Sequence, residues 1–169
     1  VATSQFFQDT VDFANEHLFG FLEIDVKNSI VFSSKEDQML FYKTSDHNGW
    51  VAAQNGIHTA GWGLNLTAHD MAKLGQLYLD GGVFNGKQIV SKSWIEKSTY
   101  TQSYCSKFKL EYGYWWWLLD KDSFAAMGDG GNMLYINRAK NIVIATTAIM
   151  VPRAKLRIDL IKKVIEPLC

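Results

Sequence analysis

Apolar residues recur every three or four positions in two stretches of the chain, a spacing that predicts amphipathic helices. The two stretches are residues 4–19 and 67–79, and a third, shorter helix is expected to begin at Ser91, a residue type that caps helices. By contrast, residues 23–57 are polar and weakly periodic, which favours a long loop. The aligned apolar positions are Phe7, Val11, Ala14 and Leu18 in the first helix and Met71, Leu74 and Tyr78 in the second.

Runs of aromatic and β-branched residues in the second half of the chain predict β-strands. Their bounds are residues 112–119, 124–127, 133–137 and 142–148, and residues 137–141 suggest a hairpin. The last strand begins with four consecutive apolar residues, so we expect it to lie between two layers of structure. A helix over residues 153–168 would supply one layer, with Ile158, Ile161, Ile165 and Leu168 along one side.

Together these elements predict an α+β fold. The fold would be an antiparallel sheet of three to four strands packed against the C-terminal helix, with a mostly helical N-terminal layer. A length of 169 residues fits one domain over residues 1–169. Within that domain, residues 1–105 would form the helical and loop part, and residues 106–169 the sheet and its C-terminal helix.

The composition excludes several classes of function. A formal net charge of zero argues against nucleic acid as a partner, because such binding needs concentrated Lys and Arg. Apolar runs stay well short of the roughly 18 residues that span a bilayer, so we expect a soluble chain without a transmembrane segment. The four histidines lack helical metal-ligand spacing, and Cys105 and Cys169 are expected to be unpaired thiols. We therefore expect no metal or other cofactor.

Residues 59–99 contain a glycine-rich loop, a helix of the pattern T-x-x-D-x-A-x-x-G, a G-G turn, N-G-K and S-x-x-W. In this order they resemble the serine β-lactamase and penicillin-binding-protein-like superfamily, in the class C branch with esterases and 6-aminohexanoate-dimer hydrolases. Residues 112–116, 128–132 and 6–24 extend the resemblance over nearly the whole chain. The matching positions of the first segment are Thr67, Asp70, Ala72, Gly75, Gly81, Gly82, Asn85, Gly86, Lys87, Ser91 and Trp94.

The resemblance implies that the chain is only the C-terminal portion of such a hydrolase. The family cleaves an amide or ester bond through an acyl-serine intermediate, using a Ser-x-x-Lys and a Tyr-x-Asn motif that should precede Val1. Residues 106–109 and 135–137 spell these two motifs, but at positions where a chance match and a packing role are favoured. Because the chain begins with Val1 rather than Met, we expect that a preceding segment was removed. The isolated chain should then be inactive.

The resemblance also places the family's third active-site motif at residues 128–132. Glycines at 130 and 131 would let a substrate approach the backbone, and the amide N–H of Asn132 would donate to an oxyanion. A carboxylate at Asp129 disfavours a substrate carboxylate, so a neutral or amine-bearing substrate fits better. The substrate-binding residues are then Asp129, Gly130, Gly131, Trp62 and Trp116. The alternatives are that residues 128–132 form a simple turn and that the tryptophans only pack.

Two further expectations concern partners. The sheet of the family is completed by two strands next to residues 142–148, and without them that strand's outer edge is unpaired. We therefore expect a homodimer or association with the missing N-terminal half. The alternative function is a non-catalytic ligand-binding or protein-interaction module on a penicillin-recognising fold.

Overall fold

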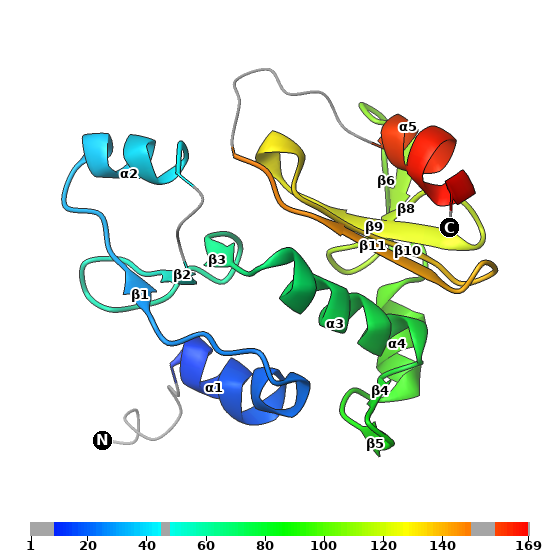
Figure 1. The fold of residues 1–169 in the computed structure, drawn as a ribbon, viewed down its shortest axis with the longest axis horizontal. Coiled ribbons are helices and arrows are strands. Elements are labelled where there is room, and N and C mark those ends of the chain that lie inside the picture. Colours follow the sequence, from blue (N-terminus) through cyan, green and yellow to red (C-terminus); the bar gives the residue numbers. More distant parts are fainter. Residues whose placement is uncertain (1–8, 45–47, 150–157, 169) are drawn as a thin grey trace. The chain divides into compact units, whose positions relative to one another are not determined.

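The computed structural model describes residues 9–44, 48–149 and 158–168. The chain divides into two compact units, Val1–Thr67 and Ala68–Cys169, which are described separately (Figure 1). Helices and predominantly antiparallel sheets confirm the α+β class. The interpretation of the whole chain as one domain stays a prediction. Among the described residues no helix has the length and apolar character needed to cross a membrane.

The first unit contains a three-stranded sheet in the order β1-β2-β3, flanked by short helices. β1 runs parallel to β2, and β2 runs antiparallel to β3. Of the predicted helix over residues 4–19, the part from Thr10 is α1, while residues 4–8 lie outside the described residues. The elements are α1 Thr10–His17, η1 Phe19–Leu22, β1 Ser29–Ile30, α2 Lys35–Phe41, β2 Gly49–Val51 and β3 Leu64–Asn65.

The prediction of a long loop over residues 23–57 is wrong. This segment contains β1, α2 and β2. Ser34 caps α2, because its hydroxyl accepts a hydrogen bond from the Asp37 amide at 3.1 Å. β1 and β2 hold each other through Trp50 N–H to Asn28 O and Ala52 N–H to Ile30 O, both at 2.9 Å. Strands this short present too few positions for a periodic pattern.

The second unit is built on a six-stranded antiparallel sheet in the order β11-β10-β9-β8-β7-β6, larger than the three to four strands expected. Its strands are β6 Ser103–Cys105, β7 Leu110–Tyr112, β8 Trp117–Leu118, β9 Ser123–Met127, β10 Met133–Asn137 and β11 Ile142–Thr146. The other elements are α3 Ala68–Leu79, β4 Val83–Phe84, β5 Lys87–Gln88, α4 Lys92–Ser98, η2 Asp129–Gly131, α5 Ile158–Leu160, η3 Ile161–Ile165 and η4 Glu166–Leu168.

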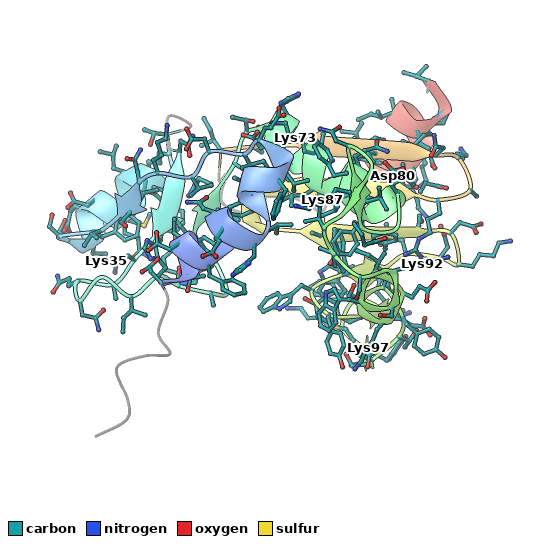
Figure 2. All side chains as sticks on the ribbon, turned by 90° about the horizontal axis from the view of Figure 1, so that it is seen from below. Lys35, Lys73, Asp80, Lys87, Lys92 and Lys97 are labelled. Atoms are coloured by element: carbon teal, nitrogen blue, oxygen red, sulfur yellow. The ribbon has the colours of Figure 1, made fainter. Side chains whose placement is uncertain are left out.

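Local signals place α3 and α4 where the sequence predicts them. α3 ends at a pair of glycines with φ of 63° and 89°, and the Gly82 amide donates to Leu77 O at 2.7 Å. The Ser91 hydroxyl caps α4 by accepting from the Trp94 amide at 3.2 Å. Lys87 is exposed on β5, between the two helices, and Lys92 is exposed at the start of α4 (Figure 2).

The sheet of the second unit has a helix on each face. Val143 and Ala145 of β11 join the apolar cluster on the α3 face, while Ile144 joins the cluster on the C-terminal helix face, confirming that this strand lies between two layers. Gly75 allows α3 to approach closely, since a Cβ there would lie 2.4 Å from Val143 Cγ1. Leu168 was expected on the covered side of the C-terminal helix and is instead 83% exposed.

Residues 112–119 form a hairpin rather than the single strand expected. β7 ends at Tyr112, and β8 begins at Trp117. Between them the Gly113 amide donates to Trp116 O at 2.8 Å, and the Tyr114 amide donates to Ser98 O of α4 at 2.9 Å. The intervening Trp115 has a φ of 67°, which reverses the chain.

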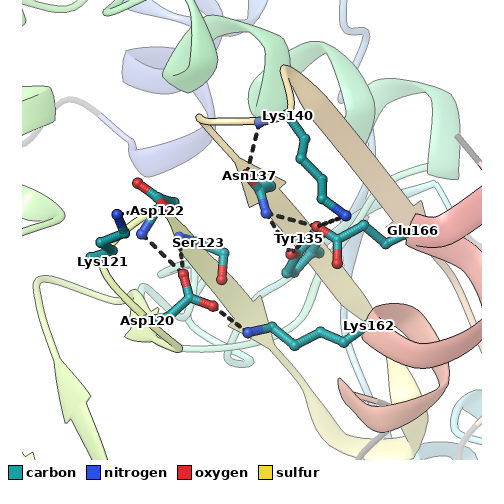
Figure 3. A network of polar contacts seen from close by, with 9 residues as sticks. All are labelled: Asp120, Lys121, Asp122, Ser123, Tyr135, Asn137, Lys140, Lys162 and Glu166. Carbon is teal, nitrogen blue, oxygen red and sulfur yellow. Dashed lines mark hydrogen bonds and ion pairs between the residues drawn. The ribbon is translucent and has the colours of Figure 1, made fainter.

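Polar side chains gather between the sheet and the C-terminal helix (Figure 3). Glu166 is 7% exposed, and its Oε1 accepts from the Tyr135 hydroxyl at 2.9 Å and from Asn137 Nδ2 at 2.7 Å. Lys140 Nζ lies 3.6 Å from the same oxygen. The network therefore ties two residues of β10 to the last turn of the chain's final helix.

An ion pair between Asp120 and Lys162 joins the same helix to the β8–β9 turn. Partial burial acts to raise the pKa of Asp120. Hydrogen bonds from Lys162, Ser123 and the Asp122 amide outweigh it and lower the pKa to about 2. The carboxylate form of Asp120 is therefore favoured in the folded protein.

This depressed pKa predicts a stability difference that depends on pH. In the folded chain Asp120 titrates near 2 and in the unfolded chain near its ordinary 3.8, so its stabilisation is present above about pH 4 and is lost as pH falls towards 2. Denaturant unfolding of the wild type and Asp120→Asn should differ at pH 5 and converge at pH 2. A difference that stays constant between pH 5 and 2 would contradict the assignment.

Candidate active site

Residues 128–132 form the turn between β9 and β10. The turn is closed by a hydrogen bond from the Gly128 amide to Asn132 O at 2.9 Å, and η2 occupies its middle. Gly130 and Gly131 have φ of 81° and 102°, values at which side chains are strained. The motif is therefore a tight glycine turn, not the strand of the family's third motif.

Two hydrogen bonds hold this turn against the end of β11. The Thr146 hydroxyl donates to Gly131 O at 3.1 Å, and the Ala148 amide donates to Asn132 Oδ1 at 2.8 Å. The end of the turn that leads into β10 is thus fixed to the end of the neighbouring strand. A backbone fixed in this way can present its amides in a constant direction.

The structure brings together four of the six predicted site residues, because Asp129, Gly130, Gly131 and Asn132 share this turn. Trp116 belongs to the second unit but is 7% exposed in its core, with Tyr78 and Phe124 at ring distances of 4.6 and 5.0 Å. These contacts support the packing alternative, and its substrate role stays a prediction.

Trp62 lies in the first unit. It is 44% exposed and stacks on Phe32 with a ring distance of 6.4 Å and an interplanar angle of 16°. Its carbonyl accepts from the Thr59 hydroxyl at 2.6 Å and from Trp50 Nε1 at 3.3 Å, so the loop around it is internally bonded. A role of Trp62 in a substrate wall also stays a prediction.

The two motif-like spellings occupy places unlike those of a nucleophile and its partner. Residues 106–109 make the turn between β6 and β7, and Lys109 there has a φ of 54°. Tyr135 and Asn137 lie on β10 and bond Glu166, as described above. Both positions agree with the chance match and the packing role favoured by the sequence.

A cavity of about 420 Å³ opens elsewhere in the second unit. Its lining includes Glu111, Phe124 and Arg138, and it lies at the start of β9, whereas the glycine turn follows the end of β9. The Arg138 guanidinium stacks 4.6 Å above the Phe124 ring and donates to the Thr99 hydroxyl at 2.7 Å. The cavity is therefore separate from the candidate active site.

The first unit holds a polar constellation that sequence reasoning missed. Ser29 Oγ lies 2.9 Å from His58 Nε2, and His58 Nδ1 lies 2.8 Å from Asp9 Oδ1. No spacing motif connects these three positions, so the pattern emerges only from the fold. Nowhere in the described part of the chain does a group of three or more His, Cys, Asp and Glu side chains form a candidate metal site.

Comparison with known proteins identifies hydrolases as relatives. No family model matches the chain. A 6-aminohexanoate-dimer hydrolase of Paenarthrobacter ureafaciens is 28% identical over 102 residues, which cover 54% of this chain and 26% of that protein. The solved structure of a putative 6-aminohexanoate-dimer hydrolase from Bacillus anthracis matches with a TM-score of 0.50 and 32% identity. The match covers 59% of this chain and 27% of the chain in that structure.

A third match is the octameric penicillin-binding protein homologue from Pyrococcus abyssi, with a TM-score of 0.49 and 17% identity. This match covers 82% of this chain and 33% of the chain in that structure. The chain thus spans about a quarter of the length of the hydrolases it matches. The resemblance read from the motifs is confirmed by the two hydrolase matches. Over the matched half of its length, the chain has a partial fold of the β-lactamase and penicillin-binding-protein-like serine hydrolases.

Proposed function

We propose that this chain is the C-terminal part of a β-lactamase-like serine hydrolase that, when complete, cleaves an amide or ester bond through an acyl-serine intermediate. The observation that carries the proposal is the glycine turn of residues 128–132, anchored to β11, in a chain related to 6-aminohexanoate-dimer hydrolases. The nucleophilic serine and its lysine would come from polypeptide outside this sequence.

In this proposal the turn stabilises negative charge on the substrate oxygen. The Asn132 amide N–H is one oxyanion donor, and Gly130 and Gly131 leave room for the substrate beside the backbone. An oxyanion donor typically contributes about 2.7–4 kcal/mol to stabilising the transition state. Because such donors act only on a substrate that a nucleophile attacks, the isolated chain would not hydrolyse amides.

The substrate class follows from the residue types at the turn. Asp129 supplies a carboxylate where a substrate carboxylate would be repelled, so an amine-bearing or neutral group is expected there. In a 6-aminohexanoate dimer, the compound named for the relatives, the amino end rather than the carboxylate end would lie beside Asp129. The wall roles expected of Trp62 and Trp116 stay predictions, and Trp116 is primarily a core residue.

The partner expected from the sequence is supported by the sheet order. β11 is the outer strand of the six-stranded sheet among the described residues. Strand edges with apolar side chains bind other strands readily. We propose that the rest of the hydrolase pairs with this edge, and that a second copy of the chain occupies it in the isolated state.

A complementation experiment tests these proposals together. The chain is mixed with the polypeptide that precedes it in the complete reading frame, and hydrolysis of a linear 6-aminohexanoate amide is followed with co-sedimentation. The chain alone should give no hydrolysis, whereas the mixture should co-sediment and hydrolyse. Gly131→Ala should lower kcat of the mixture about 10²-fold, because a side chain is strained at the φ of 102° and the shifted backbone would misplace the neighbouring Asn132 donor.

Gly86→Ala is the matched control. Gly86 has a positive φ of 76° in the β4–β5 turn, and a Cβ there meets nothing within 4 Å. It reports the general cost of alanine at such a φ, so it should leave kcat of the mixture unchanged. Co-sedimentation without hydrolysis, from a preceding segment that lacks Ser-x-x-Lys, would instead favour the non-catalytic binding module.

A further inference from the structure

Asp9, His58 and Ser29 form a hydrogen-bonded relay within the first unit. Ser29 Oγ lies 2.9 Å from His58 Nε2, and His58 Nδ1 lies 2.8 and 2.9 Å from the two oxygens of Asp9. Each ring nitrogen of the histidine therefore has one partner, a hydroxyl on one side and a carboxylate on the other. A serine nucleophile, its base and the group that orients the base have this geometry.

Three separate elements bring these side chains together. Ser29 lies on β1 and pairs with Trp50 of β2. His58 forms an isolated bridge with Ala52, just beyond the end of β2. Paired residues on adjacent strands share a face of the sheet, so Ser29, Ala52 and His58 face one side, and the small Ala52 lets the ring cross towards Ser29. Asp9 stands at the N-cap of α1.

The positions of Asp9 and His58 are fixed by further hydrogen bonds. Asp9 Oδ1 accepts from the Val11 amide at 2.9 Å. Partial burial opposes ionisation, but this bond and the contact with His58 lower the pKa of Asp9 overall. Next to His58, the Thr59 amide donates to Val51 O at 2.9 Å, and Thr59 O accepts from Trp50 Nε1 at 2.7 Å. The carboxylate and the ring are therefore held before any ligand binds.

These contacts favour one tautomer of the ring. An ionised Asp9 accepts only, so in the neutral form of His58 the hydrogen lies on Nδ1 and the lone pair on Nε2. The Ser29 hydroxyl then donates to Nε2, which is the direction required for removing its proton. The ring itself is almost completely buried at 8% exposure, whereas Ser29 is exposed.

Ser29 is exposed, so its hydrogen bond to His58 differs from the usual pairing of a hydroxyl buried in a core. A buried hydroxyl needs a protein partner, but an exposed one can bond water at no cost. The bond to His58 is thus not needed to satisfy Ser29, although it does satisfy the buried ring nitrogen, and it aligns the hydroxyl of an exposed serine with a base. A reagent can reach Ser29 without entering the core.

We propose that Ser29 is an activated nucleophile that accepts acyl groups from small activated esters, with His58 as its base and Asp9 as the group that orients His58. Ser29 Oγ attacks the ester carbonyl while Nε2 takes the hydroxyl proton, and the bond to the phenolate leaving group breaks. The imidazolium then releases this proton to the solvent. Neutral His58 removes a proton from water, which attacks the acyl carbonyl, and Ser29 Oγ leaves with the proton returned from Nε2, releasing the acid. The net reaction consumes one ester and one water and yields one acid and one phenol.

This reactivity does not involve the proposed active site, and it departs from the expectation that the isolated chain is inactive. It uses no residue of the glycine turn and no Ser-x-x-Lys motif. A phenolate leaves without being protonated, whereas an amide nitrogen requires an acid, so amides are not expected to react at Ser29. Hydrolysis of esters and the absence of amide hydrolysis by the isolated chain are therefore compatible.

The test uses the 169-residue chain with two probes, p-nitrophenyl acetate and an alkyl fluorophosphonate. The fluorophosphonate should form a bond between Ser29 Oγ and phosphorus with loss of fluoride, and peptide mass spectrometry should locate the adduct on Ser29. Ser29→Ala should abolish the adduct, and His58→Asn should slow acetylation about 10²-fold, the typical contribution of a positioned base. Asp9→Asn keeps a capping side chain and should slow it less.

Ser33→Ala is the matched control, because Ser33 is another exposed serine whose hydroxyl contacts the carboxylate of Asp37 and no histidine. The Ser33→Ala variant should form the fluorophosphonate adduct and hydrolyse p-nitrophenyl acetate like the wild type. Because Ser29 is exposed, its alanine variant should fold, which circular dichroism checks, so the result remains decisive even if His58→Asn unfolds. An adduct on another residue, or equal rates for Ser29→Ala and the wild type, would overturn the proposal.

Discussion

Trp116→Ala is expected to lower the free energy of unfolding of the second unit by about 3–5 kcal/mol, the usual cost of removing a large buried aromatic ring. The ring is 7% exposed and meets Phe124 edge-on at 5.0 Å and Tyr78 at 4.6 Å. Guanidinium unfolding followed by circular dichroism measures the loss.

Trp115→Ala is the neighbouring control. Trp115 is 70% exposed, and its φ of 67° is kept by the hairpin rather than by its side chain. Exposed substitutions usually change stability by less than about 0.5 kcal/mol, so the two variants should differ strongly. If Trp116→Ala kept the wild-type stability but weakened hydrolysis by the complemented enzyme, the substrate-wall interpretation would replace the packing interpretation.

The sequence predicted most accurately the elements that local chemistry defines. α3, its glycine end and the Ser91 cap depend on side chains within one turn of the helix. β10 occupies the predicted residues 133–137, a short run of buried residues bounded by glycines on one side and a tight turn on the other. The resemblance to hydrolases, drawn from the same local signals, is supported by relatives at 28% and 32% identity.

Elements that depend on distant contacts were predicted less well. The run of aromatic residues after Gly113 has strand propensity throughout, yet the bond between Tyr114 N–H and Ser98 O turns the chain there. Leu168 departs from the predicted stripe because η3 is a π-helix and η4 a 3₁₀-helix. A change of helical period rotates later residues away from the face that Ile158 and Ile161 define.

The candidate sites also differ in whether local sequence or distant contacts define them. Residues 129–132 could be located by their motif, but whether they form a strand or a turn depended on the bonds to Thr146 and Ala148. The Ser29, His58 and Asp9 relay could not be read from the sequence at all. Its geometry requires the pairing of Ser29 with Trp50 and the bridge between Ala52 and His58.

Glu166→Ala is expected to lower the free energy of unfolding by about 1–3 kcal/mol, because two buried donors lose their shared acceptor. The Tyr135 hydroxyl is then unpaired as a donor, whereas Asn137 Nδ2 still bonds that hydroxyl at 3.2 Å. The donors are the Tyr135 hydroxyl and Asn137 Nδ2, which now share Oε1 of Glu166 (Figure 3). Lys140 is 51% exposed and should add little. Denaturant unfolding measures the loss, and hydrogen exchange of residues 158–168 should show the helix opening.

Two further variants separate the hydrogen bonds from the charge. Glu166→Gln keeps an oxygen acceptor at the same place and should cost less than Glu166→Ala. Adding Tyr135→Phe to Glu166→Ala removes the donor that lost its acceptor, so the double variant should lose less stability than the two single changes summed. If instead the two single changes summed without any recovery, the Tyr135 hydroxyl would not depend on Glu166. The network would then not be what holds the C-terminal helix to β10.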